Sequence, residues 1–168
     1  DAQVTVDFQD FNDQTAGTHG DGVNGVITNR RYYSLAGEDV TDAHELAIAR
    51  ALGGDTLISY DYGDVRLSVQ SGGVMSTDGE MEGRAVNTVV TTSAVDNGDG
   101  TTSTQTVVHD QEGTYYAVMS GDAETEDNEI VGIVVIEGIP YAEGVVARET
   151  GGFIVYRGAG NEAFSRGE

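Results

Sequence analysis

The chain has 168 residues, 38% of them hydrophobic, which is long enough for a domain with its own core and too apolar for a disordered protein. Its 29 acidic residues outnumber its 8 basic residues, all arginine, and the resulting net charge of −21 disfavours binding to nucleic acids and anionic membranes. The lack of cysteine excludes disulfides and thiolate metal sites, and no apolar run approaches the ~20 residues of a membrane-spanning helix.

The N-terminal region, residues 1–55, begins with a predicted strand. Val4, Val6 and Phe8 alternate with polar residues, which is the period of a half-buried strand. A loop rich in Gly, Asp, Asn and Thr is predicted to follow over residues 9–25.

One short helix is predicted over residues 43–52, where apolar side chains form a stripe along one face. Asp42 is a good N-cap and Glu45 can complete a capping box, while Gly53 and Gly54 are expected to end the helix. A helix of fewer than three turns is not stable alone in water, so we expect it to dock on a sheet.

Residues 56–158 are expected to form the core of a barrel, within a single domain that spans residues 1–168. The Asn-Gly sequence inside 96–100 predicts a tight hairpin, and two further tight connections are expected at 62–64 and 150–151. Segments rich in β-branched and aromatic residues predict eight strands, at 56–62, 65–71, 82–94, 102–109, 113–119, 129–136, 143–149 and 152–157.

These strands favour a mainly β protein, an antiparallel up-and-down β-barrel of about eight strands with one short helix, because their connections are of hairpin length. A β-sandwich is the alternative. Residues 129–136 are apolar on both faces, which predicts a central strand or a strand covered by the helix. Gly132 within this segment indicates a bend or a close contact.

Glycine motifs recur toward the C-terminal end, at 112–116, 121–123 and 151–153. Ala123 precedes the Glu-x-x-Gly step at 129–132, which enters an apolar strand. In this pattern residues 112–158 resemble the closing barrel of the transferrin-binding-protein-B-like surface proteins of Gram-negative bacteria. An acidic insertion at 124–127 and the lack of a lipidated N-terminal cysteine depart from that family. The resemblance implies a small barrel, export, and binding of a protein or metal carrier without catalysis.

No catalytic residues are predicted. His19, His44 and His109 lie in a predicted loop, a helix and a strand end, and no serine lies in a Gly-x-Ser-x-Gly elbow. His44-Glu45 lacks the second histidine of a helical zinc motif. A glycosidase-like carboxylate pair is the weaker alternative, because a chain with 29 acids brings carboxylates together by chance.

Calcium is the one metal ion that the sequence brings into consideration, and no other cofactor is expected. Asp96, Asn97 and Asp99 offer the oxygen ligands that a hard cation prefers, and are the candidate metal ligands. Their spacing differs from that of an EF-hand loop, and a plain hairpin turn also explains these residues.

The candidate partner-binding residues are Arg30, Arg31, Tyr32 and Tyr33, a basic and aromatic cluster in a chain without lysine. Arginine and tyrosine are the residue types that most often anchor interfaces. The alternative is that the two tyrosines alternate in and out of a strand while the arginines pair with nearby acids.

We expect an exported, non-catalytic binding module at the cell surface or in the periplasm, since the sequence opens at Asp1 as a processed chain does. Its partner would be a protein or a small ligand, including a nutrient or a metal carrier, and would bind loops at the barrel ends. The alternative is a homo-oligomeric structural subunit of a filament, adhesin or surface layer, which donates the strand at 4–8 to a neighbour.

Overall fold

The computed structural model describes residues 2–9, 22–68, 79–120, 129–141, 144–156 and 164–165. In chain order the elements are β1 (Gln3–Gln9), β2 (Gly22–Thr28), α1 (Thr41–Gly53), β3 (Leu57–Ser68), β4 (Glu80–Asp96), β5 (Thr102–Ser120), β6 (Glu129–Pro140), β7 (Val146–Tyr156) and β8 (Phe164–Ser165).

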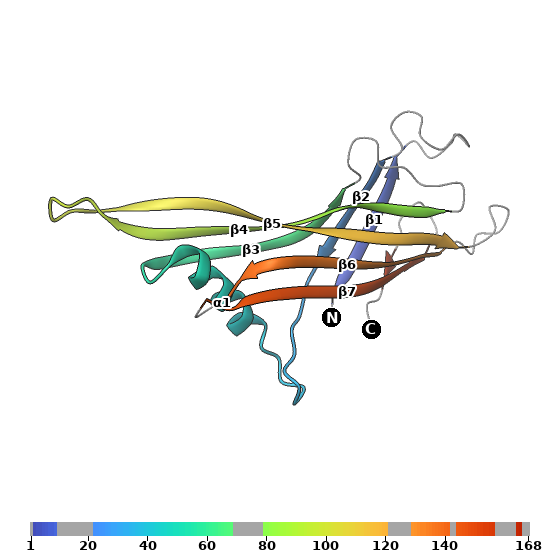
Figure 1. Ribbon diagram of the computed structural model, residues 1–168, viewed down its shortest axis with the longest axis horizontal. Coiled ribbons are helices and arrows are strands. Elements are labelled where there is room, and N and C mark those ends of the chain that lie inside the picture. Colours follow the sequence, from blue (N-terminus) through green and yellow to red (C-terminus); the bar gives the residue numbers. More distant parts are fainter. Residues whose placement is uncertain are drawn as a thin grey trace.

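Each strand pairs antiparallel with the next strand along the chain, as in a meander (Figure 1). Six strands, β2 to β7, form a curled sheet with the shape of a half-barrel; β1 pairs with β2, and the two-residue β8 pairs with β7. The prediction of a mainly antiparallel β protein with one helix is therefore confirmed in the described part of the chain. Closure into a barrel of about eight strands remains a prediction.

Three predicted strand boundaries are wrong. The segments 56–62 and 65–71 belong to β3, 102–109 and 113–119 to β5, and 143–149 and 152–157 to β7, except where their ends lie outside the described residues. The Gly63 region is a β-bulge, because the register shifts between Tyr62 and Val65 while both flanks stay paired with β4. Gly63 serves close approach here, since a methyl group at this position would lie 2.7 Å from the carbonyl oxygen of Thr88.

The loop predicted over residues 9–25 overlaps β2, which already begins at Gly22, and residues 10–21 lie outside the described part of the chain. The Asn-Gly hairpin prediction holds: β4 and β5 flank residues 97–101 and pair in continuous register from Asp96↔Thr102 onward. The other two predicted turns do not form, because the chain stays paired through a bulge at 62–64 and through a continuous strand at 150–151. The Gly-Asp and Thr-Gly sequences alone do not reveal this pairing.

The helix begins two residues earlier than predicted, at Thr41, and its N-cap is Val40, which has no side-chain capping bond. Asp42 therefore lies in the first turn, where its charge still favours the helix dipole. The preceding Asp39 takes the expected capping role in part, since its Oδ1 accepts the Thr41 backbone N–H at 3.0 Å. The C-terminal end is as predicted, with Gly54 at φ +72° donating to the Arg50 carbonyl.

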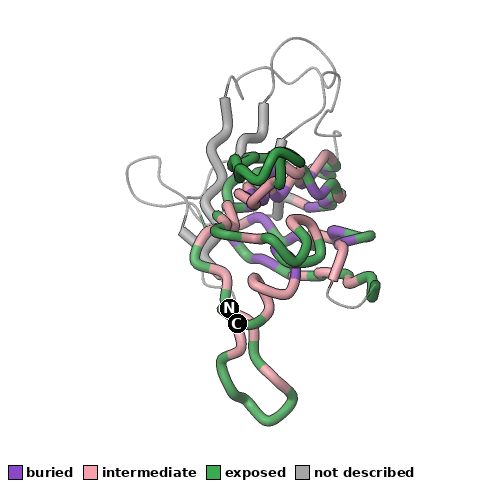
Figure 2. Tube along the Cα trace, turned by 90° about the vertical axis from the view of Figure 1, so that its left-hand side faces the viewer, coloured by how far each residue is buried: buried purple, intermediate pink, exposed green. Residues whose placement is uncertain are grey.

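Helix α1 packs against β3, β4 and β6 on the inner side of the sheet, as the docking prediction requires. Its Ile48 and Ala49 are fully buried. Figure 2 views the molecule from the end of the β4–β5 hairpin, which is exposed, and shows the buried stretches on the strands of the sheet. None of the described helices has the length and apolar character that a bilayer span needs.

Strand β6 lies between β5 and β7, in accordance with its predicted central place. Gly132 makes the expected close contact: a methyl group there would lie 2.3 Å from the ring of Phe153. The outer face of β6 is not covered by the helix, because Val131 is 44% exposed and Ile133 is 52% exposed.

Candidate functional site

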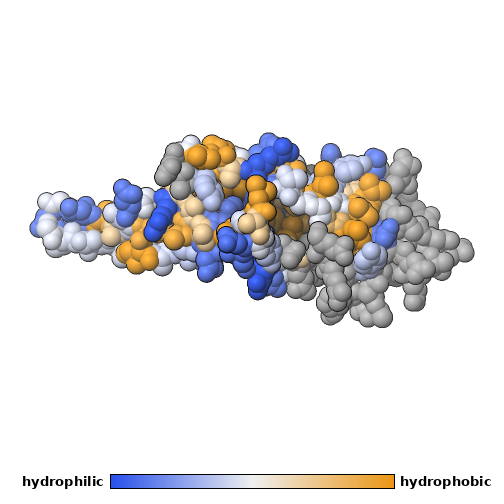
Figure 3. All heavy atoms as spheres, turned by 90° about the horizontal axis from the view of Figure 1, so that it is seen from below, coloured by the Kyte–Doolittle hydropathy of each residue, from blue (hydrophilic) through white to orange (hydrophobic). Residues whose placement is uncertain are grey.

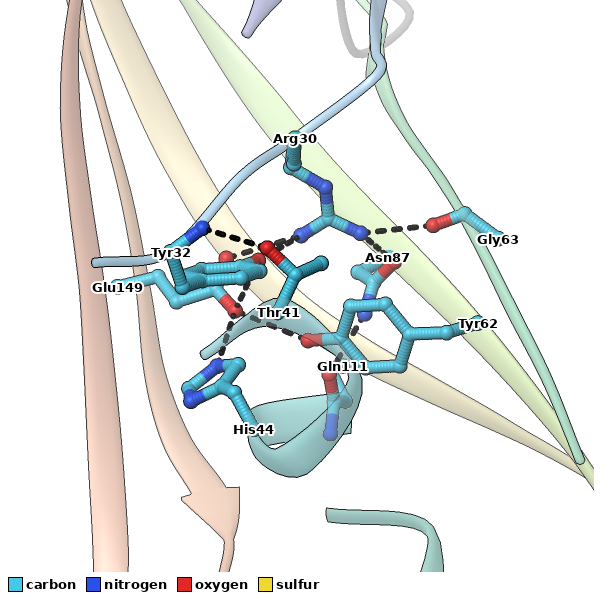
Figure 4. A network of polar contacts seen from close by, with 9 residues as sticks. All are labelled: Arg30, Tyr32, Thr41, His44, Tyr62, Gly63, Asn87, Gln111 and Glu149. Carbon is cyan, nitrogen blue, oxygen red and sulfur yellow. Dashed lines mark hydrogen bonds and ion pairs between the residues drawn. The ribbon is translucent and has the colours of Figure 1, made fainter. Parts of the chain in front are cut away.

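A buried polar network lies inside the curled sheet, centred on Arg30 (Figure 4). Arg30 lies two residues after the end of β2, and its guanidinium donates to four acceptors. One terminal nitrogen bonds the Tyr32 hydroxyl at 3.0 Å and Glu149 Oε2 at 2.9 Å. The other bonds the Gly63 carbonyl at 2.7 Å and Asn87 Oδ1 at 2.8 Å. The bulge in β3 therefore presents a backbone acceptor to this arginine.

Glu149 of β7 is the second centre of the network. Its Oε1 accepts the hydroxyls of Tyr32 at 2.8 Å and Tyr62 at 2.9 Å, and lies 3.4 Å from His44 Nε2. The His44 ring stacks on Tyr32 with 4.0 Å between the ring centroids. The carboxylate thus joins β7 to β3, to α1 and to the segment after β2.

The electrostatics of the pair are mutually reinforcing. Burial raises the pKa of Glu149, but the hydrogen bond from His44, the charge of Arg30 and the two tyrosine hydroxyls outweigh it and lower that pKa to about 2. Burial disfavours the charged form of Arg30, yet its neighbours Tyr32 and Glu149 raise the pKa of the guanidinium above its ordinary value. At neutral pH Glu149 is therefore a carboxylate, and His44 must donate its Nε2 proton to it.

The pKa values of both tyrosines are also raised. Burial is the main cause for Tyr32 and for Tyr62, and the negative charge of Glu149 adds to it. The hydroxyls therefore stay protonated and act as donors to the carboxylate.

The network continues along the inner face of β4 and β5. Asn87, fully buried, donates from Nδ2 to Gln111 Oε1 at 2.8 Å. Gln111 Nε2 and the Tyr115 hydroxyl are buried and have no protein partner among the described residues. Since buried polar atoms are nearly always paired, these two groups mark interior positions suited to water or to a ligand atom.

A cavity of about 470 Å³ adjoins the network. The polar lining of this cavity consists of Arg30, Arg31, Tyr32, His44, Arg148, Glu149 and Thr150. The apolar lining comes from the inner faces of four strands and from one residue before β1, and consists of Ala2, Ile27, Val65, Val134, Ile136 and Phe153. Gly151 and Gly152 also line it, and a methyl group at Gly151 would meet a single side-chain atom, Val134 Cγ1, at 3.4 Å.

The structure separates the four residues predicted to bind a partner. Arg30 and Tyr32 turn inward and belong to the network, whereas Tyr33 is 47% exposed. Arg31 pairs at the surface with Asp39, at 3.3 Å. The tyrosines thus alternate between interior and solvent, and both arginines contact acids. Their role in partner binding remains a prediction.

Asp96, Asn97 and Asp99 lie in the β4–β5 turn, where their side chains bond the local chain. Asp96 accepts the Gly98 backbone N–H at 2.8 Å, and Asp99 accepts the Thr101 N–H at 2.9 Å. The hydrogen bonds from the hydroxyl and backbone of Thr101 lower the pKa of Asp99. Within the described residues no group of three or more His, Cys, Asp or Glu side chains could hold a metal ion. Calcium binding in this turn stays a prediction.

Sequence reasoning did not identify Glu149, Tyr62, Asn87 or Gln111 as site residues. Asn87 carried a usable signal, because it occupies an inward position between Ala85 and Val89 of a β-branched strand. A polar residue at an apolar position of the period-2 pattern is a candidate for a buried network.

Comparison with known proteins does not assign the chain to a family. No family model, curated protein or solved structure matches it. The resemblance of residues 112–158 to transferrin-binding-protein-B-like proteins therefore remains a prediction.

Proposed function

We propose that this chain is a non-catalytic binding module, which takes the apolar part of a small ligand into the cavity beside the Arg30–Glu149 pair. The observation that carries the proposal is the cavity itself. Its volume of about 470 Å³ and its mixture of apolar strand residues with a few fixed polar groups are typical of small-molecule sites inside curled sheets.

The state of the polar network favours binding over turnover. Glu149 already accepts from Arg30, Tyr32, Tyr62 and His44, and Arg30 has four acceptors of its own. A general acid or base needs a proton position open to the substrate, and a pKa near the working pH. A carboxylate with a pKa of about 2 and four donors suits a rigid wall better than a catalytic group.

The ligand class follows from the polar groups that line the cavity. In the neutral form of His44 that donates from Nε2, the other ring nitrogen is an acceptor. The three arginines of the lining already pair with acids, Arg30 with Glu149, Arg31 with Asp39 and Arg148 with Glu137, so a charged ligand would have to displace one of these acids or be buried without a counter-ion. A neutral molecule with an apolar body and one N–H or O–H donor therefore fits best.

Two further parts of the proposal concern setting and shape. We place the module outside the cytoplasm, at the cell surface or in the periplasm. The basis is the predicted family resemblance of residues 112–158, together with the acidic composition. We also propose that the half-barrel closes through its terminal strands, because β1 contacts both β7 and β8. Capture of a nutrient or metal carrier by the barrel-end loops is compatible with such a module.

The alternative role, a structural subunit that donates its N-terminal strand, is constrained by the pairing of β1. This strand pairs with β2 of its own chain along its full length, from Gln3↔Thr28 to Gln9↔Gly22. Donation would therefore require β1 to leave its own sheet and exchange with a neighbour.

Titration with N-phenyl-1-naphthylamine, a neutral apolar fluorophore with one N–H donor, tests the cavity proposal. Both glycines line the cavity, but burial alternates along β7, so the side chain of Gly151→Leu would point inward and fill the cavity, whereas that of Gly152→Leu would point outward. We expect saturable fluorescence enhancement for the wild type and Gly152→Leu, and a loss of affinity of at least about tenfold for Gly151→Leu, the equivalent of 1.4 kcal/mol. Equal binding by all three proteins, each checked by thermal unfolding, would exclude this cavity as the site.

A further inference from the structure

Strand β5 extends well beyond its neighbour β6. It pairs with β4 from Thr102 to Val118, but with β6 only from Gly113 to Ser120. From Thr102 to Glu112 the outer edge of β5 has no strand partner within the described part of the chain. Figure 1 shows this part of the β4–β5 hairpin projecting beyond the rest of the sheet.

The projecting edge lacks the usual protection against strand addition. Free edges normally carry lysine, proline, inward charges or bulges. Residues 101–108, Thr-Thr-Ser-Thr-Gln-Thr-Val-Val, contain no charge and no proline, and all eight are exposed. The register with β4 runs without a shift along the whole hairpin. In Figure 3 the projecting end of the molecule has a mixed, mainly pale to blue surface.

The charge distribution indicates which kind of strand this edge accepts. The chain carries a net charge of −21, so a basic partner would be drawn to its acidic surfaces in preference to this neutral segment. A second copy of the same chain would meet no like charge along residues 101–108. The uncharged edge is thus a place where two strongly acidic molecules can touch without direct repulsion.

We propose that two copies of this chain pair antiparallel along the free edge of β5, with a two-fold axis between Gln105 and the Gln105 of the second copy. Thr104 then lies opposite Thr106 of the second copy, and Ser103 lies opposite Val107. Such pairs of β-branched and hydroxyl side chains suit an antiparallel ladder. The two sheets become continuous through the hairpins, which leaves both cavities accessible.

Salt provides a signature of this dimer. The backbone bonds across the edge are neutral, whereas the two acidic bodies repel each other at a distance. Raising the ionic strength screens that repulsion, so the dimer should become more stable in salt. An interface held by ion pairs would weaken instead.

Sedimentation velocity over a concentration series, at about 0.05 M and about 0.5 M NaCl, tests the proposal. The test variant is Thr104→Glu, which puts a charge beside the two-fold axis. The matched control is Thr114→Glu, an exposed threonine of the same strand where β6 already covers the edge, opposite Val135. We expect a salt-favoured dimer for the wild type and the control, with the dissociation constant of Thr104→Glu raised at least about tenfold, the equivalent of 1.4 kcal/mol.

Two results would overturn the proposal. One is a wild-type protein that stays monomeric at every concentration and salt level. The other is a Thr104→Glu protein that dimerises as strongly as the wild type, which would place the interface elsewhere. Because neither result involves the cavity, the ligand-binding proposal would stand or fall separately.

Discussion

Arg30 and Glu149 form a buried ion pair, 2.9 Å between nitrogen and oxygen, across 119 positions of the sequence. Their side chains are 11% and 16% exposed, and together they hold the segment after β2 against the last long strand. Tyr32, Tyr62 and His44 complete the set of donors around the carboxylate. The pair thus fixes one wall of the cavity.

Glu149→Gln should destabilise the fold markedly. The substitution leaves Arg30 as a buried charge without its counter-ion, a change that costs on the order of 3 kcal/mol in the free energy of unfolding. Urea unfolding followed by circular dichroism measures this cost. The matched control is Glu137→Gln, which breaks the exposed pair with Arg148 and should change stability by less than about 0.5 kcal/mol. Similar effects of the two variants would show that the buried pair is not a structural centre.

Protonation of Glu149 should make the folded protein less stable at acid pH. Its folded-state pKa is lowered to about 2 from an ordinary value of 4.5, so its contribution is fully present above about pH 5 and is lost as the pH falls toward 2. The other carboxylates are present in both the wild type and Glu149→Gln. Their contribution therefore drops out when the free energies of unfolding of the two proteins are subtracted. We expect this difference to be constant from pH 7 to about 5 and to shrink below that. A difference that stays flat down to pH 2 would contradict the assignment.

Gly132→Ala should destabilise the sheet by about 1–3 kcal/mol, because the added methyl group overlaps the ring of Phe153. The double variant Gly132→Ala with Phe153→Leu should recover part of that loss, since the smaller side chain leaves room. Gly152→Ala is the control, because its nearest atom is 3.8 Å away. Additive effects in the double variant would refute the packing of Phe153 on Gly132.

Gly63→Ala tests the bulge in β3. A methyl group at this position would lie 2.7 Å from the Thr88 carbonyl oxygen, so the bulge must shift and carry the acceptor of Arg30 with it. We expect a loss of more than about 1 kcal/mol in the free energy of unfolding. Gly151→Ala, with ordinary van der Waals contact to Val134, should lie within about 0.5 kcal/mol of the wild type. Equal free energies of unfolding for Gly63→Ala and Gly151→Ala would mean that the close approach of the Thr88 carbonyl does not explain the glycine at position 63.

The fold class was accessible from the sequence because period-2 patterns and the Asn-Gly turn report local geometry. The strand boundaries were not, since Gly63-Asp64 in a bulge and Thr150-Gly151 inside β7 have the composition of tight turns. Pairing with a neighbouring strand decides between the two, and pairing is a property of the whole sheet.

The site was partly accessible in the same sense. Arg30 and Tyr32 stood out because basic and aromatic residues cluster there in an acidic chain. Their partner Glu149 did not stand out among 29 acids, because its inward position depends on the register between β6 and β7. The helix start was missed by two residues, since Asp39, not Asp42, bonds the free backbone N–H of Thr41.

The central claim is that an apolar ligand enters the inner cavity and not the exposed apolar outer face. Amide and methyl NMR shifts during titration with N-phenyl-1-naphthylamine test it most directly. The account predicts that Ile27, Val65, Ile136 and Phe153 respond together, while the outer-face residues Val131, Ile133 and Ile154 do not. Shifts confined to the outer face, or none at saturating probe, would contradict it.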